Sequence, residues 1–164
     1  MRELAPYAID ELGSAPFQFV ARAELDADPL AVFAELGTPS LWFPMMRRSV
    51  WRSGATSGVG ALREVDVLGF GRFRERMLAW DPGERLAFTM IATSSPLVAR
   101  MAEDWVLSPG ERGTHVEWRV VMRPSAIGRL AQPALPALLR GMFAAARRGL
   151  GKRAGSYPRA KHVA

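Results

Sequence analysis

Three charged residues fall at positions where strand alternation turns a side chain inward. Arg63 shares its face with the apolar residues of its strand, and Glu75 and Glu103 do the same on two later strands. Desolvating a charge without a partner is costly, so each inward charge needs a partner or a function. A carboxyl group among apolar side chains has a raised pKa, which suits general acid or base catalysis, and an arginine can polarise a carbonyl or enolate.

Two interpretations of this polar row stay open. In the first, Arg63 and Glu75 form a structural ion pair, and Glu103 sits near a cavity mouth or is protonated. In the second, all three line a wet cavity and orient a ligand or move its protons, as a few polar groups do in otherwise apolar pockets.

Other chemistry is sparse in the sequence. The absence of cysteine excludes a thiolate nucleophile, a disulfide and a cysteine metal site. His115 is expected to face outward and His162 lies in the C-terminal tail, each without a metal-binding or triad partner nearby. Gly151 and Lys152 lack the remainder of a phosphate-binding loop, and no Gly-x-Ser-x-Gly elbow occurs. We therefore expect no metal and no cofactor.

Alternation and turn residues place these side chains on a meander of strands. A half-buried strand begins at Phe17, and six more strands are expected between Arg47 and Arg123. Between them, Asp28 caps a short helix that ends at Gly37. The apolar segment 41–46 is expected to be a second short helix or turn.

The period changes after Pro124, where an amphipathic helix is expected. Its apolar stripe consists of Leu135, Leu138, Leu139, Met142, Phe143, Ala146 and Leu150. A sheet with one apolar face and one such helix bury their apolar surfaces best when the helix lies across the concave side of the sheet. This arrangement predicts an α+β fold.

The hairpin turns also predict registers. The turn at 68–70 sets Arg63 opposite Glu75 on the inner face, with acids opposite arginines outside. The turn at Pro109-Gly110 pairs Trp105 with Trp118, so that Asp104 meets Arg119 on the outer face.

The order of elements and several local phrases resemble the polyketide cyclase/dehydrase group of the START-like (SRPBCC, helix-grip) superfamily. These phrases are Asp28-Pro29-Leu-Ala-Val-Phe33, Trp42, Gly58-Val-Gly60-Ala-Leu-Arg63, Arg74-Glu75, Trp80-Asp-Pro82 to Arg85-Leu86, Trp105-Val-Leu-Ser-Pro109 and Gly113-Thr-His-Val-Glu-Trp118.

The resemblance implies a curved antiparallel sheet of about seven strands around a long C-terminal helix, with two short helices after the first strand. It covers residues 16–155 as one domain, which leaves 1–15 as a poorly ordered lead-in and 156–164 as a basic tail. It also implies a deep hydrophobic cavity for lipids, aromatic polyketides or similar molecules, but it supplies no catalytic motif.

Aromatic and methionine side chains on the inward faces are the candidates to line that cavity. Methionine suits a pliable pocket that accepts irregular ligands, although the same residues also suit an ordinary core. The candidates are Trp42, Phe43, Phe73, Met77, Phe88, Met90, Trp105, Trp118, Leu138 and Met142.

Charge is distributed unevenly along the chain. Of 22 basic and 16 acidic residues, ten basic residues and no acidic residue lie from Trp118 onward. A solvated helix face explains this pattern, and so does contact with an anionic membrane or an acidic partner. Nucleic acid is not expected, because the basic run lacks interleaved aromatic residues and a recognisable reading motif.

Composition favours a soluble cytoplasmic protein, since 49% of residues are hydrophobic, 23% are charged and the N-terminus lacks the apolar core of a signal peptide. Oligomeric state is left open. Three functions remain: a carrier or sensor of a hydrophobic small molecule, a cyclase or dehydratase using Glu75 and Glu103 with Arg63, and a module that docks on an anionic membrane or partner.

Overall fold

The computed structural model describes residues 1–52, 54 and 57–157. Its strands are β1 (Arg2–Glu3), β2 (Phe17–Leu25), β3 (Met46–Trp51), β4 (Leu62–Val67), β5 (Gly71–Asp81), β6 (Arg85–Thr93), β7 (Val98–Pro109) and β8 (Thr114–Pro124). Its helices are α1 (Pro29–Leu36), α2 (Ala126–Ala131) and α3 (Leu135–Ala154), with short 3-10 helices η1 (Ile9–Ser14), η2 (Pro39–Leu41) and η3 (Gln132–Ala134).

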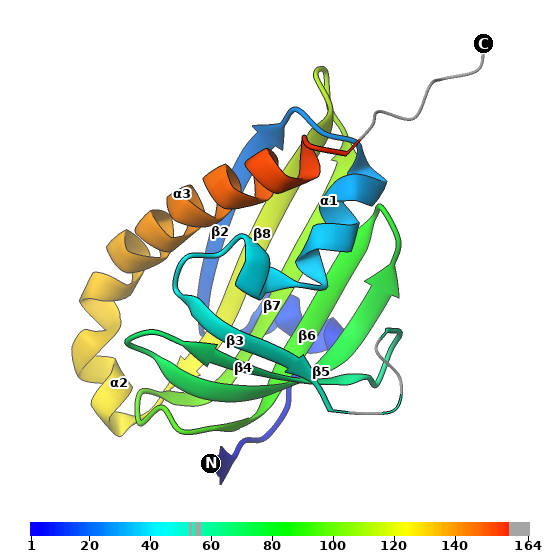
Figure 1. The fold of residues 1–164 in the computed structure, drawn as a ribbon. Helices are drawn as coiled ribbons and strands as arrows, with labels where there is room; N and C mark the ends of the chain where they lie inside the picture. Colours follow the sequence, from blue (N-terminus) through cyan, green and yellow to red (C-terminus); the bar gives the residue numbers. More distant parts are fainter. Residues whose placement is uncertain (53, 55–56, 158–164) are drawn as a thin grey trace.

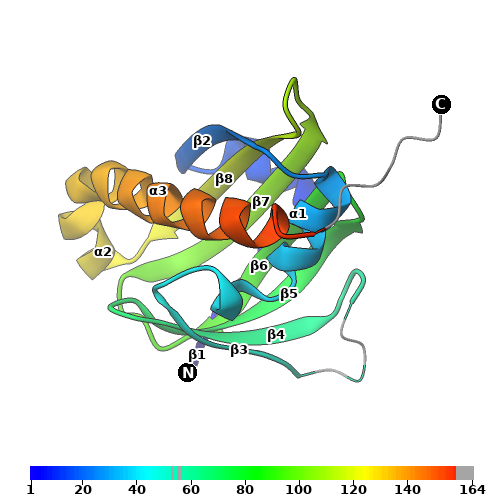
Figure 2. The ribbon, with the colours of Figure 1, turned by 45° about the horizontal axis from the view of Figure 1, so that its top comes forward.

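One antiparallel sheet bends around the long helix α3. Its strands follow the order β2-β8-β7-β6-β5-β4-β3, and β1 pairs separately with β6. Figure 2 shows α3 lying across the concave side, with β2 on one side of the helix and β3 and β4 on the other. The α+β helix-grip architecture expected from the sequence is therefore confirmed.

The predicted registers are confirmed on the inner face. Arg63 lies opposite Glu75, and Trp105 lies opposite Trp118. On the outer face Asp104 lies opposite Arg119 as expected. However, the Asp104 carboxylate binds the Arg85 guanidinium of β6 through two contacts of 2.9 Å. Two parallel N–H···O bonds from one neighbouring strand explain why Arg85 is the partner rather than Arg119.

The first short helix is confirmed as α1. Its N-cap is Asp28, whose carboxylate accepts a hydrogen bond from the Leu30 amide. The second is a single 3-10 turn, η2, that ends where the predicted segment 41–46 begins. Pro44 and the start of β3 at Met46 leave no room for a helix within that segment.

The expectation of a poorly ordered lead-in at residues 1–15 differs from the structure. Residues Arg2–Glu3 form β1, which pairs with β6, and η1 lies behind the sheet, on the side away from α3 (Figure 1). Tyr7, Leu12 and Ala15 pack on Ala102 and Val121 of the outer sheet face. The segment therefore covers an apolar patch that alternation alone assigns to solvent.

The hydroxyl of Tyr7 is buried without a hydrogen-bond partner among the described residues. An unsatisfied buried hydroxyl carries a desolvation penalty of about 1–3 kcal/mol. We therefore expect Tyr7→Phe to raise the free energy of unfolding by about 1 kcal/mol in urea titrations. A loss of stability in this variant would show that the hydroxyl has a bonding role.

No helix in the described part of the chain is both long and apolar enough to cross a membrane. The last residues of the expected basic tail, 158–164, including His162, lie outside the described residues.

Candidate functional site: a cavity between the sheet and the terminal helix

A largely apolar cavity of about 100 Å³ lies between the concave sheet and α3. The sheet contributes residues from β3 to β8, and α3 contributes one face of its first three turns. The lining residues are Leu36, Pro39, Trp42, Phe43, Met46, Arg63, Val65, Val67, Phe70, Phe73, Glu75, Leu86, Phe88, Met90, Val98, Met101, Glu103, Trp105, Trp118, Met122, Leu135, Leu139, Met142 and Ala146.

Eight of the ten cavity residues expected from the sequence line this space. They are Trp42, Phe43, Phe73, Phe88, Met90, Trp105, Trp118 and Met142. Met77 is 1% exposed but packs in the core outside the lining. Leu138 is 40% exposed, because the buried stripe of α3 runs through Leu135, Leu139 and Phe143 and leaves Leu138 on its flank.

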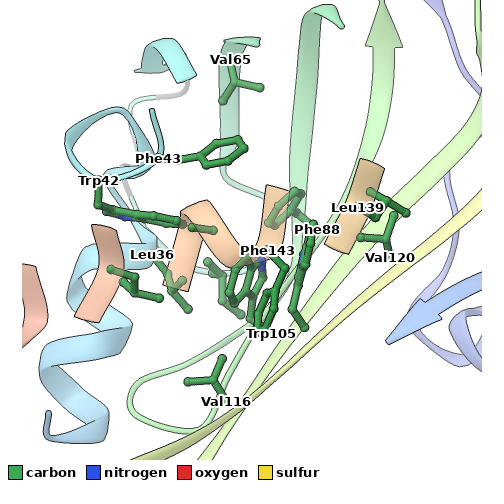
Figure 3. Close-up of a cluster of buried hydrophobic side chains, with 14 of the residues drawn as sticks. Leu36, Trp42, Phe43, Val65, Phe88, Trp105, Val116, Val120, Leu139 and Phe143 are labelled. Atoms are coloured by element: carbon green, nitrogen blue, oxygen red, sulfur yellow. The ribbon is translucent and has the colours of Figure 1, made fainter. Parts of the chain in front are cut away.

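The wall formed by the sheet and α3 is aromatic. Trp105 stacks on Trp118 with ring centroids 5.4 Å apart, and Trp118 stacks on Phe143 of α3 at 5.7 Å. Trp42 meets the edge of this stack from the η2–β3 segment. Figure 3 shows Trp42, Trp105 and Phe143 converging on the same region from three elements.

Trp42 is held from two sides. Its indole N–H donates to the Glu35 carbonyl oxygen at 2.6 Å. Its own carbonyl lies against Gly149 of α3, where a Cβ atom would be 1.9 Å from the Trp42 oxygen. The side chain of Glu35 is buried and pairs with Arg153 of α3 at 3.1 Å. The segment that carries Trp42 is therefore fixed to α3 by contacts that were not predicted from the sequence.

The expected inner pair of Arg63 and Glu75 is present. Arg63 Nε donates to Glu75 Oε2 at 2.6 Å, and both side chains are almost fully buried. Arg63 Nη1 also donates to the Leu36 carbonyl at the C-terminal end of α1, at 3.0 Å. A helix C-terminus favours a cation, so α1 contributes to holding the guanidinium.

Aromatic rings complete the surroundings of Arg63. Its guanidinium lies 5.4 Å from the Trp51 ring centroid and 5.1 Å from that of Phe88. Burial raises the pKa of the Glu75 carboxyl, while the neighbouring guanidinium acts in the opposite direction. Cation–π contacts and the short ion pair together form a closed, internally neutral unit at the cavity wall.

Glu103 differs from Glu75 because none of the basic side chains that the structure describes contacts it directly. Its Oε2 accepts a hydrogen bond from the Trp118 indole N–H at 2.8 Å. Burial raises the pKa of Glu103 to about 7, and repulsion by Glu75 adds to the rise, whereas Trp118, Arg63 and Trp105 oppose it. The cavity thus contains a carboxyl group that changes charge near neutral pH.

This raised pKa makes stability depend on pH. A carboxyl with a higher pKa in the folded state binds protons there that the unfolded chain releases, so stability falls as pH rises from about 4.5 to about 7. A shift of this size corresponds to at most about 3 kcal/mol, and the partial exposure of the side chain lowers this to about 2 kcal/mol.

We expect Glu103→Gln to remove most of that slope and to stabilise the protein at pH 8, because the amide oxygen can still accept from Trp118. Urea titrations of both proteins at several pH values between 5 and 8 measure this difference. If the free energy of unfolding depends on pH in the same way in both proteins, Glu103 is not the source of the slope.

Comparison with known proteins agrees with this geometry. A family model described as polyketide cyclase / dehydrase and lipid transport matches residues 16–155. No curated protein is significantly similar to the chain.

Solved structures share the fold at low sequence identity. The Zhui aromatase/cyclase from Streptomyces sp. R1128 superposes with a TM-score of 0.70 at 15% identity, covering 85% of this chain and 93% of that one. The major latex-like protein 151 of Panax ginseng gives 0.66 at 10% identity, covering 84% and 97%. A protein from Chromobacterium violaceum gives 0.63 at 19% identity, covering 87% and 100%. Because the family model spans nearly the whole helix-grip domain, the chain belongs to the polyketide cyclase/dehydrase and lipid transport family.

Proposed function

We propose that the protein binds a hydrophobic small molecule, such as a lipid, an aromatic compound or a polyketide-like compound, in the cavity between the sheet and α3. It would act as a carrier or sensor without chemistry of its own. The observation that carries this proposal is the composition of the lining, in which only Arg63, Glu75 and Glu103 carry charge among the described residues. An apolar pocket with a few polar groups is the usual form of a small-molecule site.

Ligand size follows from the methionines of the lining. An apolar cavity of about 150 Å³ can hold a benzene ring, so this cavity of about 100 Å³ has to expand, through movement of its side chains, to accept an aromatic ligand. Five of the lining residues are methionines, whose unbranched side chains change rotamer readily: Met46, Met90, Met101, Met122 and Met142.

Native mass spectrometry of the freshly purified protein tests the proposal, with the denatured mass as the reference. An adduct of a few hundred daltons would support it and give the ligand class. For apo protein, quenching of tryptophan fluorescence by naphthalene-sized hydrocarbons provides a second test, because Trp42, Trp105 and Trp118 line the cavity. If no adduct is found and the hydrocarbons do not quench the fluorescence, the proposal is overturned.

A cyclase or dehydratase activity is a second candidate, favoured by Glu103. A carboxyl group with a pKa of about 7 in a cavity is suited to proton transfer at neutral pH. Glu75 is less suited, because its Oε2 is engaged by Arg63. Unchanged turnover of a confirmed substrate by a protein carrying Glu75→Gln and Glu103→Gln would exclude this role.

Membrane docking through the C-terminal helices is a third candidate, favoured by exposed apolar residues beside basic ones. Ile127 and Leu130 of α2 are 57% and 85% exposed, and Arg129 lies between them. Arg140 and Arg147 are both exposed, and their spacing of two helical turns places them on the same face of α3. This combination suits the surface of an anionic bilayer.

Co-sedimentation with vesicles of phosphatidylglycerol and phosphatidylcholine tests docking. Binding should collapse between low and physiological ionic strength, and Leu130→Ser should weaken it further. Equal binding to phosphatidylcholine alone, or binding that ignores salt, would exclude docking through this surface.

A further inference from the structure

We propose that the cavity selects an uncharged ligand whose carbonyl or hydroxyl group hydrogen-bonds to Glu103, and that it discriminates against carboxylates. This inference rests on the proposed binding function and specifies the chemical class of the ligand.

Arg63 is not available as a counter-ion for an acidic ligand. Its Nε is bonded to Glu75 at 2.6 Å, and its Nη1 is bonded to the Leu36 carbonyl at 3.0 Å. The side chain is 2% exposed and lies between aromatic rings. A ligand carboxylate would have to compete with Glu75 for a guanidinium that is already neutralised.

Glu103 is the polar group best placed to contact a ligand. It lines the cavity and retains a partly exposed side chain. Because Oε2 accepts from Trp118, a proton on the carboxyl belongs on Oε1, where it can be donated to a carbonyl oxygen. When the carboxyl is ionised, it can instead accept from a hydroxyl group. The ionised form repels a ligand carboxylate, and the protonated form offers a carboxylate one hydrogen bond, which does not replace the hydration that the anion loses on entering an apolar cavity.

The charged groups that face Glu103 from the sheet are Glu75 and Arg63, and these two neutralise each other in one ion pair. The described α3 residues that line the cavity are all apolar. A ligand anion would therefore lose its hydration on entering a space whose described lining offers it no unpaired cation.

Three ligands of similar shape provide the test on the wild-type protein: 2-ethylnaphthalene, 2-acetylnaphthalene and 2-naphthoate. Binding is measured by tryptophan quenching and confirmed by calorimetry. At pH 6 we expect the ketone to bind at least about fivefold more tightly than the hydrocarbon, and the carboxylate at least about tenfold more weakly than the ketone. The ketone should lose most of its advantage at pH 8, where Glu103 is largely ionised.

Glu103→Gln is the matched variant. It should remove the pH dependence of ketone binding, because the amide does not titrate. His115 lies opposite Glu24 and Ser108 toward the β7–β8 turn and is not among the residues that line the cavity, so His115→Gln is the control and should leave the pH dependence unchanged.

The outcomes separate the two proposals. If the hydrocarbon does not bind at all, the proposed binding function fails. If the hydrocarbon binds but the ketone has no advantage, or 2-naphthoate binds as tightly as the ketone, the binding function stands and the selectivity proposal is overturned.

Discussion

Glu75→Ala is expected to destabilise the protein by about 3–5 kcal/mol, because it leaves the Arg63 guanidinium buried without its carboxylate. The two residues lie opposite each other on β4 and β5, and the hydrogen bond between them is 2.6 Å long. The carbonyl of Leu36 and the two aromatic rings cannot neutralise the remaining charge. Urea unfolding followed by circular dichroism measures the loss.

A paired substitution serves as the control. Replacing both partners at once, Arg63→Met with Glu75→Leu, removes both charges and keeps the interior apolar. Buried ion pairs replaced in this way often leave stability unchanged or higher. We therefore expect the double variant to be markedly more stable than Glu75→Ala. A Glu75→Ala protein within about 1 kcal/mol of wild type would contradict the burial of the pair.

The double variant also separates the two interpretations of the polar row. If it still binds the hydrocarbon and the ketone like wild type, the pair is structural. If ketone binding is lost while hydrocarbon binding persists, the pair contributes to ligand recognition.

Gly149→Ala is expected to cost about 3 kcal/mol or more, because the added Cβ would lie 1.9 Å from the Trp42 carbonyl oxygen. The obstacle is backbone, so α3 and the η2–β3 segment have to separate. Trp42 lines the cavity, so the same change should alter tryptophan quenching by bound hydrocarbon.

Gly141→Ala is the matched control on the same helix. Nothing lies within 4 Å of a Cβ at Gly141, and alanine in a helix interior is favoured over glycine by about 0.5–1 kcal/mol. This variant should therefore be slightly stabilised. Similar thermal midpoints for the two variants would show that α3 does not approach Trp42 closely.

The parts of the fold that follow from the periodic spacing of apolar residues along strands and helices were predicted well. Strand alternation and turn positions placed Arg63 opposite Glu75 and Trp105 opposite Trp118, because a register shift by one residue would expose every apolar side chain of a strand. The same pattern predicted most of the cavity lining.

Features that do not show in the spacing of apolar residues were not predicted. The segment around Tyr7 and Leu12 has no repeating apolar spacing, and its packing depends on a patch formed by two strands about 100 residues later in the chain. Glu35 lies on a short helix, and nothing in its neighbours signals the contact with Arg153. Leu138 was wrongly predicted to line the cavity. An apolar stripe shows which face of a helix is buried, but it does not show how wide a part of that face the sheet covers.

The strand order has a consequence for how the chain reaches this structure. From β3 to β8 every strand pairs with its neighbour in sequence, so these hairpins can form as the chain emerges during synthesis. By contrast, β8 is the one partner of β2 among the described strands, with Phe17 opposite Met122, and β1 pairs with β6. The N-terminal strands must therefore wait until most of the chain has been made, and closure of this long loop is expected to limit the folding rate.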